Sequence, residues 1–197
     1  MQLNLFGYEK DDNLIDSNRY EYFPLIQPPF SINNHTLNLK VDNGVSYREA
    51  RKSPAHISLM KVRTVEACDD KIINLITWAC RGIFSFQVKT NRYNYFNNGG
   101  KKTIYMAIEN QEPIKHIFER IDMQLSNSIR NRRNFTPHIT VFKTIPVSMF
   151  EQVYPQMQNK PFEYNFICCS VLILKKDLNK EHSRFKELAK VELLSNN

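Results

Sequence analysis

The sequence lacks any long apolar run. No stretch approaches the roughly 20 consecutive apolar residues that a membrane-spanning helix needs. The first twelve residues, MQLNLFGYEKDD, have no basic flank followed by a long apolar segment, so they do not resemble a secretory signal. We therefore expect a cytoplasmic protein that has no membrane partner.

Cysteines are few, and their spacing does not suit a metal or disulfide framework. They are Cys68, Cys80, Cys168 and Cys169, and none of them forms a C-x-x-C motif. The adjacent pair is poorly placed to bridge to itself, and a zinc site needs three or four ligands. This pattern favours free thiols in a reducing compartment. We expect no metal and no cofactor.

Several common catalytic motifs are also absent. There is no Gly-rich phosphate loop, no dinucleotide-binding fingerprint and no G-x-S-x-G elbow. The composition, with 42% hydrophobic and 24% charged residues, is that of a soluble globular protein. A formal charge of +7 favours a polyanionic partner such as nucleic acid, although a solvated basic surface would give the same charge.

The hydrophobic pattern predicts an α+β fold. We expect strands over 20–26, 55–62, 83–96, 103–109 and 138–145, a helix or turn over 148–157, one or two strands within 162–176, and helices near 71–81, 112–129 and 181–194. NNGGKK at 97–102 predicts a tight turn. No linker divides the chain, so we expect an N-terminal arm over 1–18 and a single two-lobed domain over 19–197.

Two similar heptapeptides, SPAHISL at 53–59 and FTPHITV at 135–141, carry the strongest functional signal. In a strand, alternation places Ser58 on the face of His56 and Thr140 on the face of His138, with Cα atoms about 6.6 Å apart in each pair. Two opposed imidazoles can act as general base and general acid, while the hydroxyls hold nonbridging oxygens. A phosphodiester suits this set. The alternative is a duplicated packing motif.

These two motifs resemble the paired H-x-T/S signature of the two-histidine phosphoesterase superfamily, in particular its bacterial 2'-5' RNA ligase and RNA 2',3'-cyclic phosphodiesterase group. TPHITVFK is similar to the second family motif, including a basic residue, Lys143, five positions after the histidine. In SPAHISLMK, Ser58 replaces the usual threonine and the family's F-L-G continuation is absent. The resemblance covers about residues 19–180 in element order.

The resemblance implies two pseudo-symmetric lobes, each an antiparallel sheet with helices outside, and a central cleft that carries both motifs. It implies hydrolysis of a 2',3'-cyclic phosphate to a 2'-phosphate, with reversible 2'-5' RNA ligation in some members. His138 would activate water and His56 would protonate the departing oxygen, while Ser58 and Thr140 would bind phosphate. The partner would be RNA or a cyclic-phosphate nucleotide, and we expect a monomer.

A second set of residues is expected to contact substrate: Lys61, Lys143, Arg130, Arg132, Arg133, Tyr93 and Tyr95. The two lysines follow their histidines by five positions, so they reach the site only if the strand twists or ends early. The arginines precede the second motif, where a loop could meet a nucleic-acid backbone. The tyrosines, with Phe96, could stack on a base or simply pack across a hairpin.

Two other functions remain open from the sequence. The looser first motif is compatible with a noncatalytic RNA-binding module. The same chemistry would also serve a small-molecule substrate, such as a cyclic phosphate of ADP-ribose.

Overall fold

The structure is a computed structural model that describes residues 19–125 and 135–195. The elements in chain order are β1 (Tyr20–Ile26), α1 (Phe30–Asp42), α2 (Tyr47–Ala50), β2 (Ile57–Ser58), β3 (Val62–Thr64), α3 (Asp69–Cys80), β4 (Phe86–Asn98), β5 (Lys101–Ile108), α4 (Glu112–Leu125), β6 (His138–Pro146), α5 (Val147–Gln158), β7 (Tyr164–Cys168), β8 (Ser170–Asp177) and β9 (Lys186–Glu192). The α+β prediction is confirmed. The predicted arm over 1–18 lies outside the described residues.

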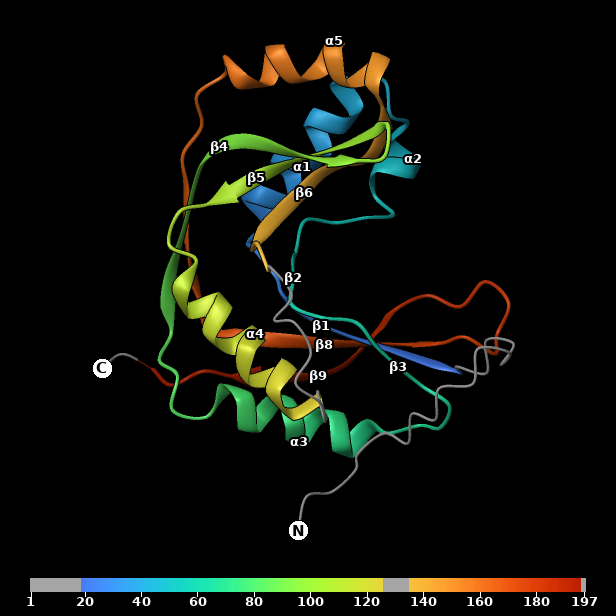
Figure 1. The fold of residues 1–197 in the computed structure, drawn as a ribbon, viewed down its shortest axis with the longest axis vertical. Coiled ribbons are helices and arrows are strands. Elements are labelled where there is room, and N and C mark those ends of the chain that lie inside the picture. The colour runs from blue at the N-terminus through green and yellow to red at the C-terminus, as the bar shows by residue number, and fades with distance from the viewer. Residues whose placement is uncertain (1–18, 126–134, 196–197) are drawn as a thin grey trace.

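The strands form one antiparallel sheet that is shared by two lobes. Its order is β7-β4-β5-β6-β2-β1-β8-β9, and β3 pairs with β1 beside this path. In the β6 lobe, which holds β4 to β7, α1 and α5 cover the sheet; in the β1 lobe, which holds β1, β3, β8 and β9, α3 and α4 lie on the outside (Figure 1). Each lobe therefore takes elements from both halves of the chain.

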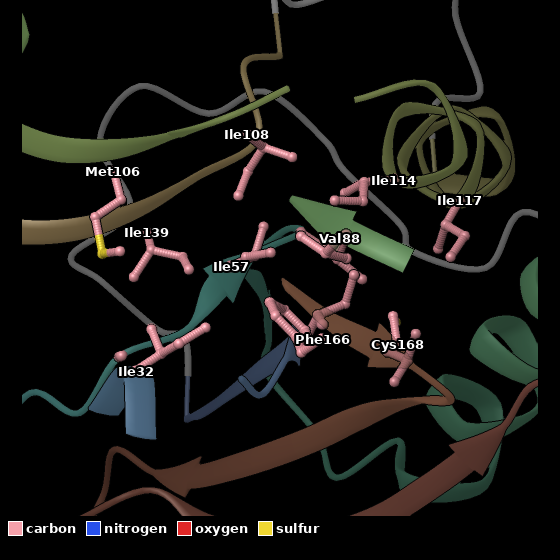
Figure 2. Packing of buried hydrophobic residues seen from close by; sticks show 14 of the residues in the cluster. Ile32, Ile57, Val88, Met106, Ile108, Ile114, Ile117, Ile139, Phe166 and Cys168 are labelled. Carbon is pink, nitrogen blue, oxygen red and sulfur yellow. The ribbon is translucent and has the colours of Figure 1, made fainter. Parts of the chain in front are cut away.

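The short strand β2 joins the two lobes. Its residue Ile57 is paired with Ile26 of β1 on one side and with Ile139 of β6 on the other. All three isoleucines have at most 1% of their surface exposed. Figure 2 shows Ile57 and Ile139 within the same buried cluster as Met106 and Ile32, so the core is continuous across the joint.

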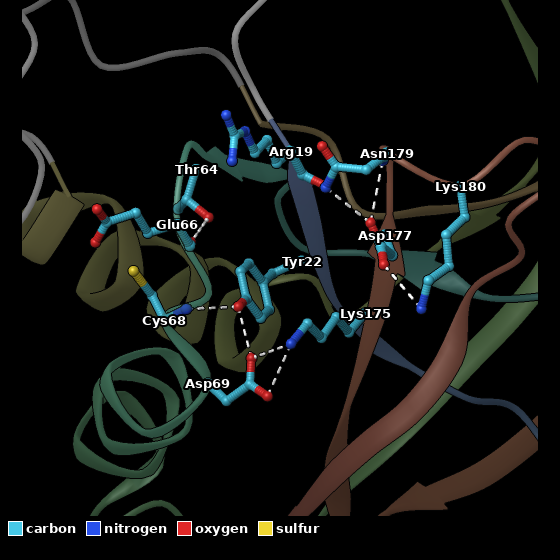
Figure 3. A network of polar contacts seen from close by, with 10 residues as sticks. All are labelled: Arg19, Tyr22, Thr64, Glu66, Cys68, Asp69, Lys175, Asp177, Asn179 and Lys180. Atoms are coloured by element: carbon cyan, nitrogen blue, oxygen red, sulfur yellow. Dashed lines mark hydrogen bonds and ion pairs between the residues drawn. The ribbon is translucent and has the colours of Figure 1, made fainter.

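A polar network fixes β1 against the first turn of α3 (Figure 3). Asp69 accepts a hydrogen bond from the Tyr22 hydroxyl at 2.6 Å and from Lys175 Nζ at 2.6 and 2.9 Å. The Tyr22 oxygen in turn accepts from the backbone N–H of Cys68 at 2.7 Å. Because β1 carries β2 on its edge, this network helps to hold the strand on which the first motif lies.

The hairpin between β4 and β5 agrees with the turn predicted at NNGGKK. Gly99 and Gly100 adopt φ values of 52° and 82°, in the left-handed region where residues with a Cβ are strained. Asn98 and Lys101 close the turn as paired residues. Two consecutive left-handed residues match the strand twist, which explains the two glycines.

Two of the predicted elements differ in the structure. The strand expected over 55–62 is broken into β2 and β3, which meet β1 at different points. The predicted helix over 181–194 is wrong, because residues 186–192 form β9. Val191 and Leu193 are buried there, and β9 pairs with β8, so ladder hydrogen bonds along the edge of the sheet outweighed a helical pattern.

Within the described ranges, none of the helices has the length and apolar character needed to cross a membrane.

Candidate active site

The two motif histidines lie on the same face of the sheet. His56 and Ser58 flank Ile57, while His138 and Thr140 flank Ile139; the two isoleucines are fully buried on the helix-covered side. Alternation therefore turns the four flanking side chains to the opposite side. We call this side, which bears His56, Ser58, His138 and Thr140, the site face.

The strand register brings the two motifs into direct contact across the lobe joint. Ile57 of β2 is the antiparallel partner of Ile139 of β6. Continuing this register by one residue in each direction places Ser58 opposite His138, and His56 opposite Thr140. Opposed residues in an antiparallel pair have Cβ atoms about 5 Å apart. Each histidine thus has the hydroxyl of the other motif as its cross-strand neighbour, in addition to the hydroxyl of its own motif.

Both imidazole rings are held in the same way. His56 Nδ1 lies 2.8 Å from the carbonyl oxygen of Pro54, and His138 Nδ1 lies 2.7 Å from the carbonyl oxygen of Thr136. A carbonyl only accepts hydrogen bonds, so each Nδ1 carries the proton and donates it. In the neutral ring Nε2 is then a free base. In each motif the accepting carbonyl lies two residues before the histidine. Both rings are therefore held alike and can transfer protons through Nε2.

The surroundings favour neutral histidines. Burial lowers the pKa of His56 from its ordinary 6.5, and the nearby charges of His138, Lys40 and Lys61 lower it further, against the opposing effect of the Pro54 hydrogen bond. Burial also lowers the pKa of His138, against the hydrogen bond to Thr136.

Aromatic rings pack against both histidines. The ring of Phe23, on β1, meets His56 edge-on with centroids 5.3 Å apart. His138 meets Phe96 edge-on at 5.0 Å and Tyr105 at 5.1 Å, and the Phe96 and Tyr105 rings stack on each other at 4.3 Å. These contacts limit ring rotation and supply the burial that lowers the two pKa values.

Lys61 lies beside His56, although simple alternation predicts the opposite face. Because β2 ends at Ser58, the chain is free to turn before β3, and Lys61 Nζ packs 4.9 Å from the centre of the Phe23 ring. It also pairs with Glu21 at 2.9 Å. Lys61 therefore contributes positive charge near His56 while one carboxylate partly neutralises it.

A bulge changes the position of Lys143. Thr140 pairs with Tyr105, but Phe142 pairs with the very next residue, Ile104, so β6 contains one extra residue at this point. A bulge shifts the alternation of the residues that follow it. Phe142 is in the core, and the exposed Lys143 consequently lies on the same side of the sheet as His138.

The structure does not bring the two predicted tyrosines to the site face. Tyr93 is buried, and its hydroxyl lies 2.7 Å from Nε2 of His35 on α1. Tyr95 contacts Phe150 and Tyr154 of α5. Both side chains face the helices of the β6 lobe, so this geometry does not support base stacking by either. Arg130, Arg132 and Arg133 lie outside the described residues.

Sequence reasoning missed Arg92 and Tyr105. Arg92 pairs with Ala107, and Ala107 pairs with His138, so these three residues form one row on the site face. Arg92 is close enough to Tyr105 to lower its pKa, against the larger effect of burial. Strand alternation places Phe96 and Tyr95 on opposite faces, so it could have indicated that Phe96 lies on the site face. The register shift between Thr90 and Arg92 was not visible in the sequence, so Arg92 could not be placed in this way.

Among residues 19–125 and 135–195, no group of three or more histidine, cysteine, aspartate or glutamate side chains is placed to hold a metal ion.

Two histidine–hydroxyl pairs on adjacent strands at the joint of a two-lobed α+β fold define a two-histidine phosphoesterase arrangement. Family comparison agrees: residues 29–180 match the 2'-5' RNA ligase superfamily. The chain belongs to this family. The resemblance seen in the sequence is thereby confirmed.

Solved structures with the same fold have very different sequences. E. coli LigT complexed with 3'-AMP has 15% identity and a TM-score of 0.62, over 89% of this chain and 98% of that one. TT0787 of Thermus thermophilus has 13% identity and a TM-score of 0.60, over 90% and 100%. Kluyveromyces marxianus Usb1 has 10% identity and a TM-score of 0.50, over 88% and 99%. No curated protein sequence matches the chain.

Proposed function

We propose that this protein is a cyclic phosphodiesterase that opens 2',3'-cyclic phosphates, on RNA ends or nucleotides, to 2'-phosphates without a metal ion. The observation that carries the proposal is the pair of imidazoles, both hydrogen-bonded at Nδ1 and, among the described residues, without a partner at Nε2, with Ser58 and Thr140 beside them. A binding site for phosphate needs cations and donors, whereas two titratable bases placed together suit proton transfer.

The family resemblance supplies the roles of the two histidines in the proposed reaction. Neutral His138 takes a proton from water through Nε2 while the water oxygen forms a bond to phosphorus. The bond from phosphorus to the ribose 3' oxygen breaks, and the imidazolium form of His56 gives that oxygen its proton. The pair ends with the proton on His138 and His56 neutral, so it must exchange one proton with solvent before the next turnover.

The hydroxyls and cations stabilise the negative charge that develops on the phosphoryl group. Ser58 and Thr140 donate to the nonbridging oxygens, and Lys61 and Lys143 add positive potential from the two strands. A ribose 5'-hydroxyl in place of water would give a 2'-5' linkage by the same proton transfers. Running the reaction backward exchanges the roles of His56 and His138.

Structures of one fold relative bear on the choice of substrate. E. coli LigT has been crystallised with 3'-AMP and with phosphate. With sequence identity at 15% or below, these structures establish a common fold, and they make a nucleotide phosphate a reasonable first substrate for this protein.

The direct test is ³¹P NMR of the purified protein with 2',3'-cyclic AMP in EDTA. We expect a 2'-phosphate product, and we expect His56→Ala and His138→Ala each to lower the rate by about 10²–10⁴-fold, because each removes one proton-transfer group. Ser58→Ala or Thr140→Ala should cost about 10²–10³-fold.

His116→Ala is the matched control, because His116 is an exposed histidine of α4, and it should leave the rate unchanged. Complete loss of turnover in EDTA would contradict the metal-free scheme. Binding of RNA with no turnover of any cyclic phosphate would favour the RNA-binding alternative.

A further inference from the structure

Helix α1 reaches from beneath the sheet to the turn that precedes His56. Lys40 Nζ donates a 2.7 Å hydrogen bond to the carbonyl oxygen of Ser53. The side-chain oxygen of Asn33, about two helical turns earlier, accepts a 2.9 Å hydrogen bond from the backbone N–H of Ala55. The residue between them, Pro54, offers the carbonyl that orients His56. Both ends of this three-residue turn are thus tied to one helix.

Lys40 is an unusual residue to find in this place. It is only 8% exposed, and burial lowers the pKa of its ammonium group. Within the part of the chain that the structure describes, no carboxylate pairs with it, and its one hydrogen-bond partner is the Ser53 carbonyl. Burying a cation without a counter-charge costs free energy. A methionine would fill similar space without this cost, so packing alone does not explain a lysine here.

We propose that Lys40 and Asn33 are positioning residues for the reaction proposed above: they clamp the Ser53–Ala55 turn so that Pro54 holds His56 with Nε2 toward the site face. The inference rests on that proposed function for its catalytic meaning, but the clamp itself is a property of the folded protein. Neither residue touches the substrate, and both act through the His56 ring.

The clamp also has an electrostatic effect. The charged groups that act on His56 are Lys40 from α1, Lys61 from the segment before β3, and His138 from β6. Each of them opposes protonation of the ring. A positive charge at Lys40 makes the imidazolium form of His56 a stronger acid, which suits the group that protonates the departing oxygen.

The test is to follow the ring nitrogens of His56 by long-range ¹H–¹⁵N NMR as a function of pH, in the full-length protein without substrate. In the parent protein we expect the Nδ1-protonated tautomer. Lys40→Met should raise the pKa of His56 and leave the pKa of His138 unchanged. Asn33→Leu should mix the two tautomers of His56, whereas Asn33→Asp keeps the acceptor and should preserve the single tautomer.

Lys52→Met is the control, because Lys52 is an exposed lysine on the same loop, 59% exposed at its side chain, and pairs with Glu49. This variant should change neither the pKa nor the tautomer of His56. If neither Lys40→Met nor Asn33→Leu alters the His56 titration or tautomer in a folded protein, the clamp is refuted.

Kinetics then separate the clamp from the proposed function. With 2',3'-cyclic AMP, Lys40→Met and Asn33→Leu should lower kcat by up to about 10²-fold with little change in KM, because a displaced general acid affects the transition state more than binding. Altered His56 spectra in a protein that turns over no cyclic phosphate would support the clamp and refute the phosphodiesterase. Altered spectra with unchanged kcat would refute the positioning role.

Discussion

The two histidines are held in the same way by their own turns. A carbonyl two residues upstream fixes the proton on Nδ1, and an edge-on phenylalanine, Phe23 for His56 and Phe96 for His138, restricts the ring. The two phenylalanines come from different lobes. The two rings are therefore alike in their immediate contacts. The charges around them differ, because Lys40 and Lys61 act on His56.

The lowered pKa values predict an acidic optimum for the free enzyme. In the proposed reaction the active form holds one proton shared between the two rings, and this form is most abundant between their two apparent pKa values. Burial lowers the pKa of both His56 and His138 below 6.5. We therefore expect the bell-shaped profile of kcat/KM for 2',3'-cyclic AMP to peak below pH 6.5.

The profile of kcat should peak at higher pH, because the bound phosphate's negative charge raises the pKa of both imidazoles. Initial rates measured from about pH 4.5 to 8.5 test both expectations. A kcat/KM maximum above about pH 7.5 would show that burial does not control the titration of these rings.

Among the described elements, the shortest strand lies between the two lobes at the site. β2 has only two residues, Ile57 and Ser58, yet it joins the two lobes and carries part of the first motif. The side chain of Ile57 is fully buried between Ile26 and Ile139. Packing at this point therefore sets the spacing between His56 and His138.

Ile57→Ala should destabilise the protein and impair the site together. Removing a fully buried isoleucine side chain typically costs about 2–5 kcal/mol. We expect a loss of this size in the free energy of unfolding, measured by urea denaturation. At low temperature, where the variant is still folded, we also expect a lower kcat, because the two motifs lose their common packing contact.

Ile167→Ala, on β7, provides the comparison, since that isoleucine is 60% exposed and its loss should change stability by less than about 0.5 kcal/mol. Equal stability losses for Ile57→Ala and Ile167→Ala would contradict the role assigned to β2.

For the whole molecule, the excess of positive charge bears on the choice of substrate. The formal charge is +7, and Lys61, Arg92 and Lys143 lie near the motifs on the site face or beside it. A polynucleotide that contacts several of these cations releases counterions on binding, and its affinity falls steeply with salt.

We expect kcat/KM for an RNA oligonucleotide with a 2',3'-cyclic phosphate end to fall steeply between about 50 and 200 mM salt, and more steeply than for 2',3'-cyclic AMP. Steady-state kinetics on both substrates at each salt concentration measure the two slopes. Equal and shallow slopes would favour a small-molecule cyclic phosphate over RNA.

Three half-buried histidines make stability depend on pH. Burial lowers the pKa of His35, His56 and His138 below the ordinary 6.5 in the folded chain. The unfolded chain therefore binds more protons than the folded chain below pH 6.5. As a result, the free energy of unfolding has its maximal histidine contribution above pH 6.5 and decreases as the pH falls through the lowered pKa values of the folded state. The paired carboxylates Glu21 and Asp69 weaken only below their ordinary values of 4.5 and 3.8.

We expect a lower urea midpoint at about pH 5.5 than at about pH 7.5. His35→Gln removes one titrating group and leaves a donor and an acceptor for the Tyr93 hydroxyl, so this variant should show a smaller difference between the two pH values. A midpoint that is higher at the lower pH would contradict the prediction.

Local patterns sufficed for the α+β class, helices α3 and α4, most strands, the glycine turn and the two histidine–hydroxyl motifs. Alternation around Ile57 and Ile139 places His56 with Ser58 and His138 with Thr140 whatever the partner strands are. These features depend on residues that are close in sequence, where backbone geometry alone relates one side chain to the next.

Only the tertiary structure decided what depends on contacts between distant segments. Pairing with β8 made a strand of residues 186–192, the bulge in β6 moved Lys143, and the register of β4 put Phe96 rather than Tyr95 beside His138. The clamp of Lys40 on the His56 turn likewise required α1 to pack beneath β6. Such features are set by long-range pairing and burial, which local propensity does not encode.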